Sequence, residues 1–142
     1  MAEFSGKPVK FEARASTEAI DSVWSLWTDV DSWSEWDKGL KSATLDGPMR
    51  LGANGTVVDN KGRASRFEIT EIKPGKSFVY EIRLPGGRMV LTKEMAENQI
   101  RHQVKFLGLS RSLFAALVGR PNMDLIGPTV DAVVELAERK FS

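Results

Sequence analysis

The chain has 142 residues, and its 20 lysines and arginines against 19 aspartates and glutamates give a net charge of +1. A chain of this length suits one domain, so we expect a single domain over residues 1–142. Binding to nucleic acid or to an anionic membrane surface requires a concentrated basic face, and the sequence has no block of like charge. We therefore expect neither of them to be the main partner.

The sequence contains no cysteine and one histidine. Disulfides, thiolate metal sites, cysteine nucleophiles and multi-histidine metal sites are therefore excluded, and we expect no metal and no cofactor. The first eight residues lack the apolar run of a signal peptide, and no segment approaches the about 18 apolar residues of a membrane span. These features predict a cytoplasmic protein without a membrane span.

The first predicted elements are a strand and two helices. Apolar residues alternate with charged ones over 9–14, which predicts a strand with one buried face. A helix is expected to follow and to end near Thr28, and a second, short helix should carry Trp33 and Trp36. We expect Trp24 to lie in the core, and Trp36, at the end of the short helix, to contact a ligand.

From residue 38 onward, turn signals separate six further predicted strands. If Glu97 and Asn98 form a two-residue turn, this turn fixes which residues of the last two strands face each other, because paired residues lie equally far from it. This register places three apolar pairs on one face: Met95 with Ile100, Leu91 with Val104, and Met89 with Phe106. Such segregation is typical of a correct register, because a slip by one residue inverts the faces.

The same register places Lys93 directly opposite His102 on the apolar face. Facing each other, each group disfavours the charged form of the other, so we expect His102 to be neutral and Lys93 charged at pH 7. The strand before them shows the same alternation, with Phe78, Tyr80 and Ile82 on one face. Phe67 and Ile69 continue this apolar face one strand earlier.

After Gly108 the pattern becomes helical. A helix is predicted over 110–118, an interruption over 119–122, and then a second helix to the end of the chain, with a kink or restart at Gly127 and Pro128. The predicted order is strand, two helices, six strands and helix. An antiparallel sheet with one apolar face needs a cover, and the C-terminal helix is the element large enough to supply it.

The segments 23–24, 28–31 and 33–37 resemble the opening of the START-like polyketide cyclase/dehydrase and lipid-transport family, within the SRPBCC superfamily. Segments 51–52, 67–72, 85–87 and 107–108 fall where that family has similar patterns. The resemblance covers nearly the whole chain and implies one START-like domain over 1–142. It implies an α+β helix-grip fold, in which a seven-stranded antiparallel sheet wraps around a long C-terminal helix. Two short helices follow the first strand, and a cavity lies between sheet and C-terminal helix.

Members of this family include carriers, hormone receptors, cyclases and proteins that bind other proteins, so the fold constrains function weakly. We expect a non-enzymatic protein that binds a small apolar or aromatic molecule, lipid- or polyketide-like, in the cavity. The residues expected to line it combine aromatic, aliphatic and methionine side chains with a few polar groups. They are Trp36, Phe67, Ile69, Tyr80, Ile82, Met89, Leu91, Lys93, His102, Val104, Phe106, Phe114 and Met123.

Two alternatives stay open. One is a cyclase- or dehydratase-type enzyme acting on a polyketide-like substrate, with Lys93, His102 and Tyr80 as candidate catalytic residues because each can carry or hold a proton. The other is a protein-interaction module whose cavity has collapsed, which an exposed apolar patch would favour. The sequence leaves the ligand, the cavity volume and the oligomeric state open.

Overall fold

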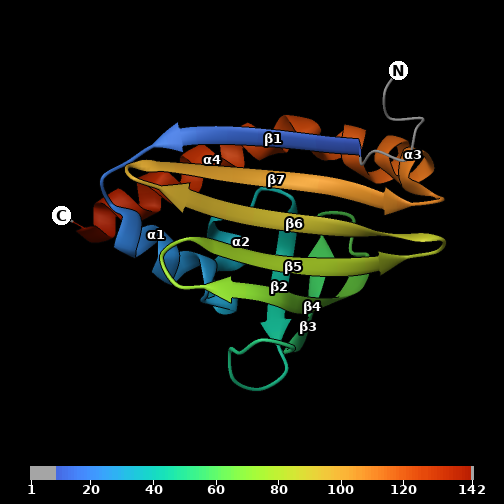
Figure 1. The fold of residues 1–142 in the computed structure, drawn as a ribbon, viewed down its shortest axis with the longest axis horizontal. Coiled ribbons are helices and arrows are strands. Elements are labelled where there is room, and N and C mark those ends of the chain that lie inside the picture. Colours follow the sequence, from blue (N-terminus) through green and yellow to red (C-terminus); the bar gives the residue numbers. More distant parts are fainter. Residues whose placement is uncertain (1–8, 142) are drawn as a thin grey trace.

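Alternating apolar and polar residues build seven strands that form one antiparallel sheet (Figure 1). The computed structural model describes residues 9–141. The order across the sheet is β1-β7-β6-β5-β4-β3-β2, so the first strand lies beside the last. The strands are β1 (Val9–Ser16), β2 (Leu40–Leu45), β3 (Asn54–Asp59), β4 (Ala64–Lys73), β5 (Ser77–Leu84), β6 (Gly87–Ala96) and β7 (Gln99–Gly108).

The hairpin of β6 and β7 has the register predicted from its turn. Ala96 pairs with Gln99 across the two-residue turn, and Lys93 pairs with His102. Glu97 takes a positive φ of 56°, as a tight two-residue turn requires of at least one of its residues. The predicted apolar pairs are confirmed, and Lys93 and His102 lie on the same face of the sheet as those pairs.

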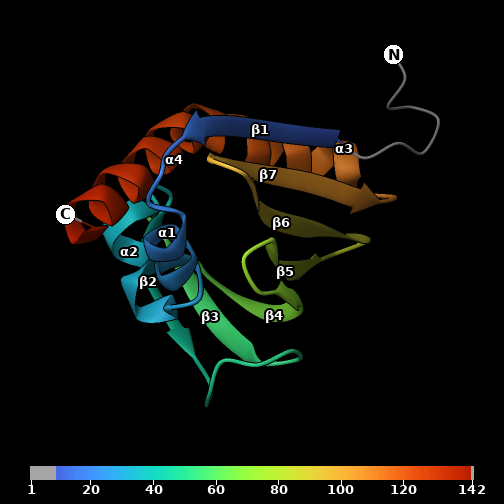
Figure 2. The same cartoon turned by 60° about the vertical axis from the view of Figure 1, so that its left-hand side comes forward.

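Three short helices follow β1 and lie inside the curve of the sheet (Figure 2). They are α1 (Ile20–Trp27), η2 (Val30–Ser32) and α2 (Trp33–Trp36). Together they bury Trp27, Trp33 and Trp36. We expected Trp24 to lie in the core, but it is only half-buried, and Trp27 takes the core position. The two rings meet edge-on, with their centroids 6.2 Å apart.

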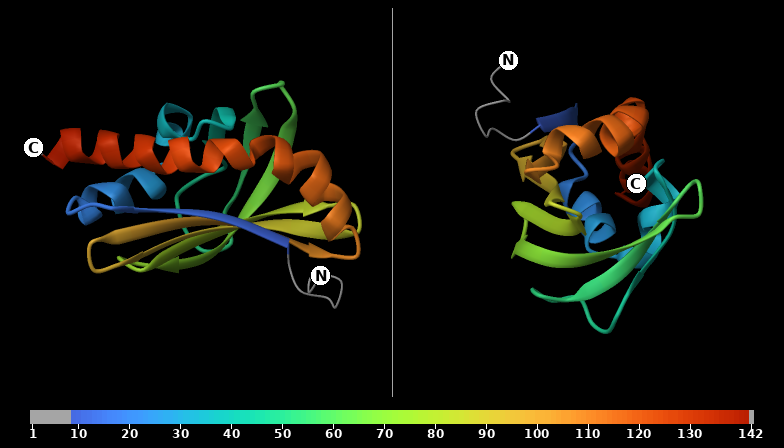
Figure 3. Two further views of the ribbon diagram at one scale, coloured as in Figure 1. Left: turned by 90° about the horizontal axis from the view of Figure 1, so that it is seen from above. Right: turned by 90° about the vertical axis from the view of Figure 1, so that its right-hand side faces the viewer.

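The C-terminal helical segment differs from the prediction. The structure has no interruption over 119–122: α3 (Arg111–Phe114) continues through the π-helical turn η3 (Ala115–Gly119) into α4 (Arg120–Phe141). Figure 3 shows the ribbon changing direction in its orange part, before the straight red part. Pro128 lies inside α4 without ending it. The helix therefore passes through a wider π turn where the sequence predicts an interruption, and such turns are a known cause of a change in helix direction.

The helical segment lies close to the sheet at Gly119. A Cβ atom there would stand 2.6 Å from Cε2 of Phe11 and 2.8 Å from Cε1 of Phe106. Only glycine allows this approach, which packs the helical segment against β1 and β7. Farther along, α4 buries Val130, Val133 and Ala137. No helix among the described residues combines the length and the apolar character that crossing a membrane needs.

Candidate functional site

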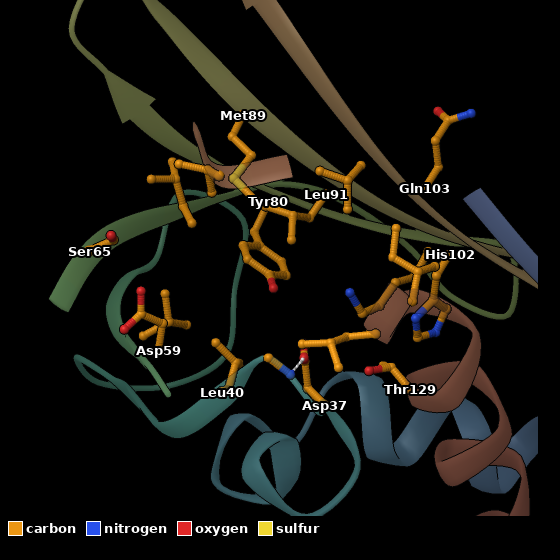
Figure 4. A pocket seen from close by; sticks show the side chains of 18 of the residues that line it. Asp37, Leu40, Asp59, Ser65, Tyr80, Met89, Leu91, His102, Gln103 and Thr129 are labelled. Carbon is orange, nitrogen blue, oxygen red and sulfur yellow. Dashed lines mark hydrogen bonds between the residues drawn. The ribbon is translucent and has the colours of Figure 1, made fainter. Parts of the chain in front are cut away.

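A cavity of about 350 Å³ lies between the sheet and the helical segment that covers it (Figure 4). Strands β3 to β7 supply one wall, and η3 and α4 supply the other. Residues between α2 and β2, and around the turn between β3 and β4, complete it. The lining consists of Asp37, Gly39, Leu40, Val57, Asp59, Arg63, Ala64, Ser65, Tyr80, Ile82, Leu84, Met89, Leu91, Lys93, His102, Gln103, Val104, Val118, Leu125, Ile126 and Thr129.

Seven of the residues predicted to line a cavity are found there: Tyr80, Ile82, Met89, Leu91, Lys93, His102 and Val104. All of them lie on β5, β6 or β7, where the two-residue alternation of side chains decides which face a residue occupies. In Figure 4, Tyr80 points into the middle of the cavity, and Met89 and Leu91 lie along the sheet above it.

The other predicted residues lie outside the lining: Trp36, Phe67, Ile69, Phe106, Phe114 and Met123. Trp36 is buried, and its indole N–H donates to Oγ of Ser32 at 3.1 Å. The ring of Trp33 covers that of Phe67, with centroids 5.4 Å apart. Phe106 packs below Gly119, and Met123 is 46% exposed. Trp36, Phe67, Ile69 and Phe106 are thus part of the core beside the cavity.

The prediction also missed polar residues that lie outside the regular strands. Asp37 directly follows α2, and Asp59 and Arg63 flank the turn between β3 and β4. The Arg63 Nε donates to Oδ2 of Asp59 at 3.0 Å, so these two form their own ion pair. A turn-flanking pair of this kind gives no signal in sequence that separates a cavity rim from an ordinary solvated turn.

Lys93 is the central charged group of the cavity. Its side chain is 4% exposed, and its Nζ lies 5.0 Å from the ring centroid of Tyr80 and 5.8 Å from that of Trp36. Such cation–π contacts stabilise a buried ammonium group. Burial nevertheless lowers the pKa of Lys93 to about 8, and the nearby Asp37 carboxylate opposes this shift.

Asp37 supplies the matching negative charge. Its Oδ1 accepts the backbone N–H of Gly39 at 2.9 Å, which fixes the carboxylate (Figure 4). Burial raises the pKa of Asp37, whereas Lys93 and the Gly39 hydrogen bond act in the opposite direction. Burial together with the Asp37 charge raises the pKa of Tyr80 well above its usual value, so the phenol keeps its proton.

His102 lies between the cavity and the buried tryptophans. Its Nε2 accepts the indole N–H of Trp27 at 3.0 Å, and its ring meets the Trp36 ring edge-on at 5.9 Å. Burial, with a smaller contribution from Lys93, lowers the pKa of His102 well below its usual value. The imidazole is therefore neutral, as predicted, with its proton on Nδ1 because Nε2 accepts a hydrogen bond.

The site thus combines an apolar wall with hydrogen-bond donors and acceptors. The Lys93 ammonium and the Tyr80 hydroxyl can donate to a carbonyl, and the Asp37 carboxylate can accept from a hydroxyl. No group of three histidine or carboxylate side chains among the described residues is placed to hold a metal ion. The polar side chains of the lining can orient a polar group and transfer protons.

Sequence comparison gives one family match. The model of the family described as "Polyketide cyclase / dehydrase and lipid transport" matches residues 10–138. No curated protein matches the sequence.

Solved structures match the fold across nearly the whole chain. Major latex-like protein 151 from Panax ginseng has a TM-score of 0.68 at 15% identity, covering 94% of this chain and 98% of that one. A hypothetical protein from Helicobacter pylori has a TM-score of 0.68 at 11% identity, with coverage of 93% and 88%. Norcoclaurine synthase from Thalictrum flavum, in complex with dopamine and hydroxybenzaldehyde, has a TM-score of 0.62 at 11% identity, with coverage of 96% and 88%. At these identities the likeness shows the fold alone, and the helix-grip prediction is confirmed.

Proposed function

We propose that this chain, which belongs to the polyketide cyclase / dehydrase and lipid transport family, binds one small apolar or aromatic molecule, lipid- or polyketide-like, in the cavity between its sheet and α4. The observation that carries this proposal is the cavity itself. Its volume of about 350 Å³ lies in the range typical of small-molecule sites. A collapsed cavity, as in the protein-interaction alternative, would not leave this space.

The lining suggests how such a molecule would lie. Ile82, Leu84, Met89 and Leu91 form an apolar wall on the sheet, and Val118, Leu125 and Ile126 face it from the helical segment. This wall would hold an apolar or aromatic body. Lys93, Asp37 and Tyr80 would hold one polar end, because they bring an ammonium, a carboxylate and a hydroxyl group into the same cavity.

A cavity-filling substitution tests the proposal. We expect Leu91→Trp to reduce the affinity for the neutral fluorescent probe N-phenyl-1-naphthylamine at least tenfold, because the indole occupies the space of the ligand. The matched control is Leu113→Trp, since Leu113 is 57% exposed on α3, outside the cavity. Fluorescence titration measures both affinities. Equal affinities for the two variants, or no binding by the natural chain, would contradict the proposal.

One observation also favours the enzymatic alternative, a cyclase- or dehydratase-type reaction. Lys93, Asp37 and Tyr80 all have shifted pKa values within one cavity, and such clusters are frequent at catalytic sites. This alternative requires turnover of a synthetic poly-β-carbonyl compound, followed by chromatography. Loss of turnover in Lys93→Arg with unchanged probe binding would support catalysis. If the natural chain does not convert the compound, the enzymatic alternative is contradicted and only the binding function remains.

A further inference from the structure

We propose that Lys93 captures small aromatic aldehydes inside the cavity as a reversible imine, an activity that rests on the binding function proposed above. The structure combines three features that this reaction needs. These are a buried amine in a largely apolar cavity, a nearby group that accepts and returns a proton, and apolar walls that hold an aromatic ring.

The position of Lys93 sets it apart from the other lysines. It lies on β6 between Phe78 of β5 and His102 of β7. Among the lysines whose side chains the structure describes, Lys93 alone is buried. Its ammonium group rests against the rings of Tyr80 and Trp36, and no ion pair or hydrogen bond to a described residue occupies it. The nitrogen is therefore available to a molecule that enters the cavity.

The charges around Lys93 favour a reactive amine. Burial lowers its pKa to about 8. Roughly a tenth of the groups are then neutral at pH 7, far more than for a lysine with an ordinary pKa. Asp37 raises the pKa, His102 is neutral, and Tyr80 keeps its proton. Asp59 and Arg63, also in the lining, are paired with each other.

The reaction balances without an oxidant or reductant. The neutral Nζ attacks the carbonyl carbon, a C–N bond forms, and the carbonyl oxygen takes a proton to become a hydroxyl. This hydroxyl leaves as water while the nitrogen loses its remaining proton, so aldehyde and amine give imine and water. Asp37 is the group placed to accept the ammonium proton and return it to the leaving hydroxyl, because its carboxylate lines the same cavity and acts electrostatically on Lys93. Addition of water reverses the reaction.

The walls select the class of aldehyde. The Tyr80 ring, which lines the cavity, lies beside the amine, and Ile82 and Leu91 extend the apolar surface along the sheet. A flat aromatic ring gains contact with these side chains while its carbonyl carbon faces the amine. An aliphatic hydroxy-aldehyde such as a sugar has to give up its hydration in the same space.

Reductive trapping tests the proposal. The full chain is incubated at pH 7 with 2-naphthaldehyde and sodium cyanoborohydride, which converts an imine into a stable secondary amine. We expect intact-mass spectrometry to show one added naphthylmethyl group and peptide mapping to place it on Lys93. Lys93→Arg keeps the positive charge and should lose this adduct. Lys61→Arg, at an exposed turn position, should keep it.

The pH profile separates a reactive role of the amine from a structural one. Trapping should rise with pH around a midpoint near the Lys93 pKa of about 8. Asp37→Asn should move this midpoint to lower pH, because the carboxylate is what favours the charged ammonium. The asparagine oxygen can still accept the Gly39 N–H, so the local fold is preserved.

Two results would overturn covalent capture: adducts spread over exposed lysines, or an adduct that persists in Lys93→Arg. If Lys93→Arg fails to fold, as judged by circular dichroism, Lys93→Met takes its place. Calorimetry with 2-naphthylmethanol, which cannot form an imine, separates the two proposals. Binding of the alcohol without trapping of the aldehyde overturns the imine and supports the cavity. Absence of both overturns both.

Discussion

The two helical layers on the concave face of the sheet are built from opposite kinds of side chain. The segment α1–α2 buries Trp27, Trp33 and Trp36, whereas α4 buries Val130, Val133 and Ala137. None of the three tryptophans lines the cavity, because all of them are buried in the core. The cavity is bordered instead by Val118, Leu125, Ile126 and Thr129 of the C-terminal helical segment. The two helical layers therefore differ in role: α1–α2 completes the core, and the C-terminal segment borders the space where a ligand can lie.

The largest expected effect comes from truncating a buried tryptophan of the α1–α2 layer. Trp33→Ala should cost about 3–5 kcal/mol in the free energy of unfolding. The Trp33 ring stacks on Tyr80 with centroids 4.7 Å apart, and its indole N–H donates to the carbonyl of Trp27 at 2.9 Å. Urea denaturation followed by circular dichroism measures the loss.

Trp24→Ala is the matched control within the same layer. Trp24 is half-buried, so its truncation should cost only about 1–2 kcal/mol. Equal losses in the free energy of unfolding for Trp24→Ala and Trp33→Ala would contradict the prediction. They would mean that Trp33 is no more important to the core than the half-buried Trp24.

The next largest effect is a pH dependence of stability, caused by the buried charge of Lys93 on β6. Its pKa is about 8 in the folded state and 10.5 ordinarily, so the unfolded chain binds more protons between these values. The free energy of unfolding should therefore rise with pH from 8 to 9.5, by about 2 kcal/mol at 1.36 kcal/mol per pKa unit. Above pH 10, Tyr80 opposes the rise, because its pKa is raised in the folded state.

Lys93→Met should abolish this rise, and Lys61→Met, at an exposed turn, should keep it. Chemical denaturation at several pH values provides the measurement. A rise that persists in Lys93→Met would assign the linkage to another group.

The smallest effects concern two glycines of the C-terminal helical segment. Gly119→Ala should destabilise the protein by about 1–2 kcal/mol, because the added methyl group meets Phe11 and Phe106. Gly127→Ala adds a Cβ that meets no residue other than its chain neighbours, but the following Pro128 disfavours helical backbone in a residue that has a Cβ and offsets the gain in helix propensity. The free energy of unfolding should therefore change by less than about 0.5 kcal/mol. Thermal unfolding of the two variants measures both changes. Equal changes for the two substitutions would show that η3 does not approach the sheet closely.

The strands were predictable because side-chain alternation and one turn determine a hairpin. Placing the turn at Glu97 and Asn98 was enough to pair Lys93 with His102. The path of the C-terminal helix was not predictable in the same way. Gly119 and Pro121 together read as a break, but the π-helical turn η3 lies just before the proline, and the helix continues through this turn into α4.

The same difference applies to the candidate site: the alternation along strands predicted part of its lining, whereas its residues outside strands were not predicted. Side chains on β5 to β7 could be assigned to the cavity by parity alone, and Tyr80, Leu91 and Lys93 lie there. Asp37 could not, because it follows a single helical turn whose direction depends on how α2 packs. Trp36 was expected to reach the ligand, but its hydrogen bond to Ser32 holds it in the core.

Tyr80 and His102 are the chain's one tyrosine and one histidine, and both line the cavity. The ring protons of each residue type therefore give a single spin system in a proton NMR spectrum, identified without isotope labelling. A molecule entering the cavity changes the ring currents at both positions at once, while the hydrogen bond from Trp27 keeps the imidazole in place. Occupancy can thus be followed directly through the ring signals of one tyrosine and one histidine.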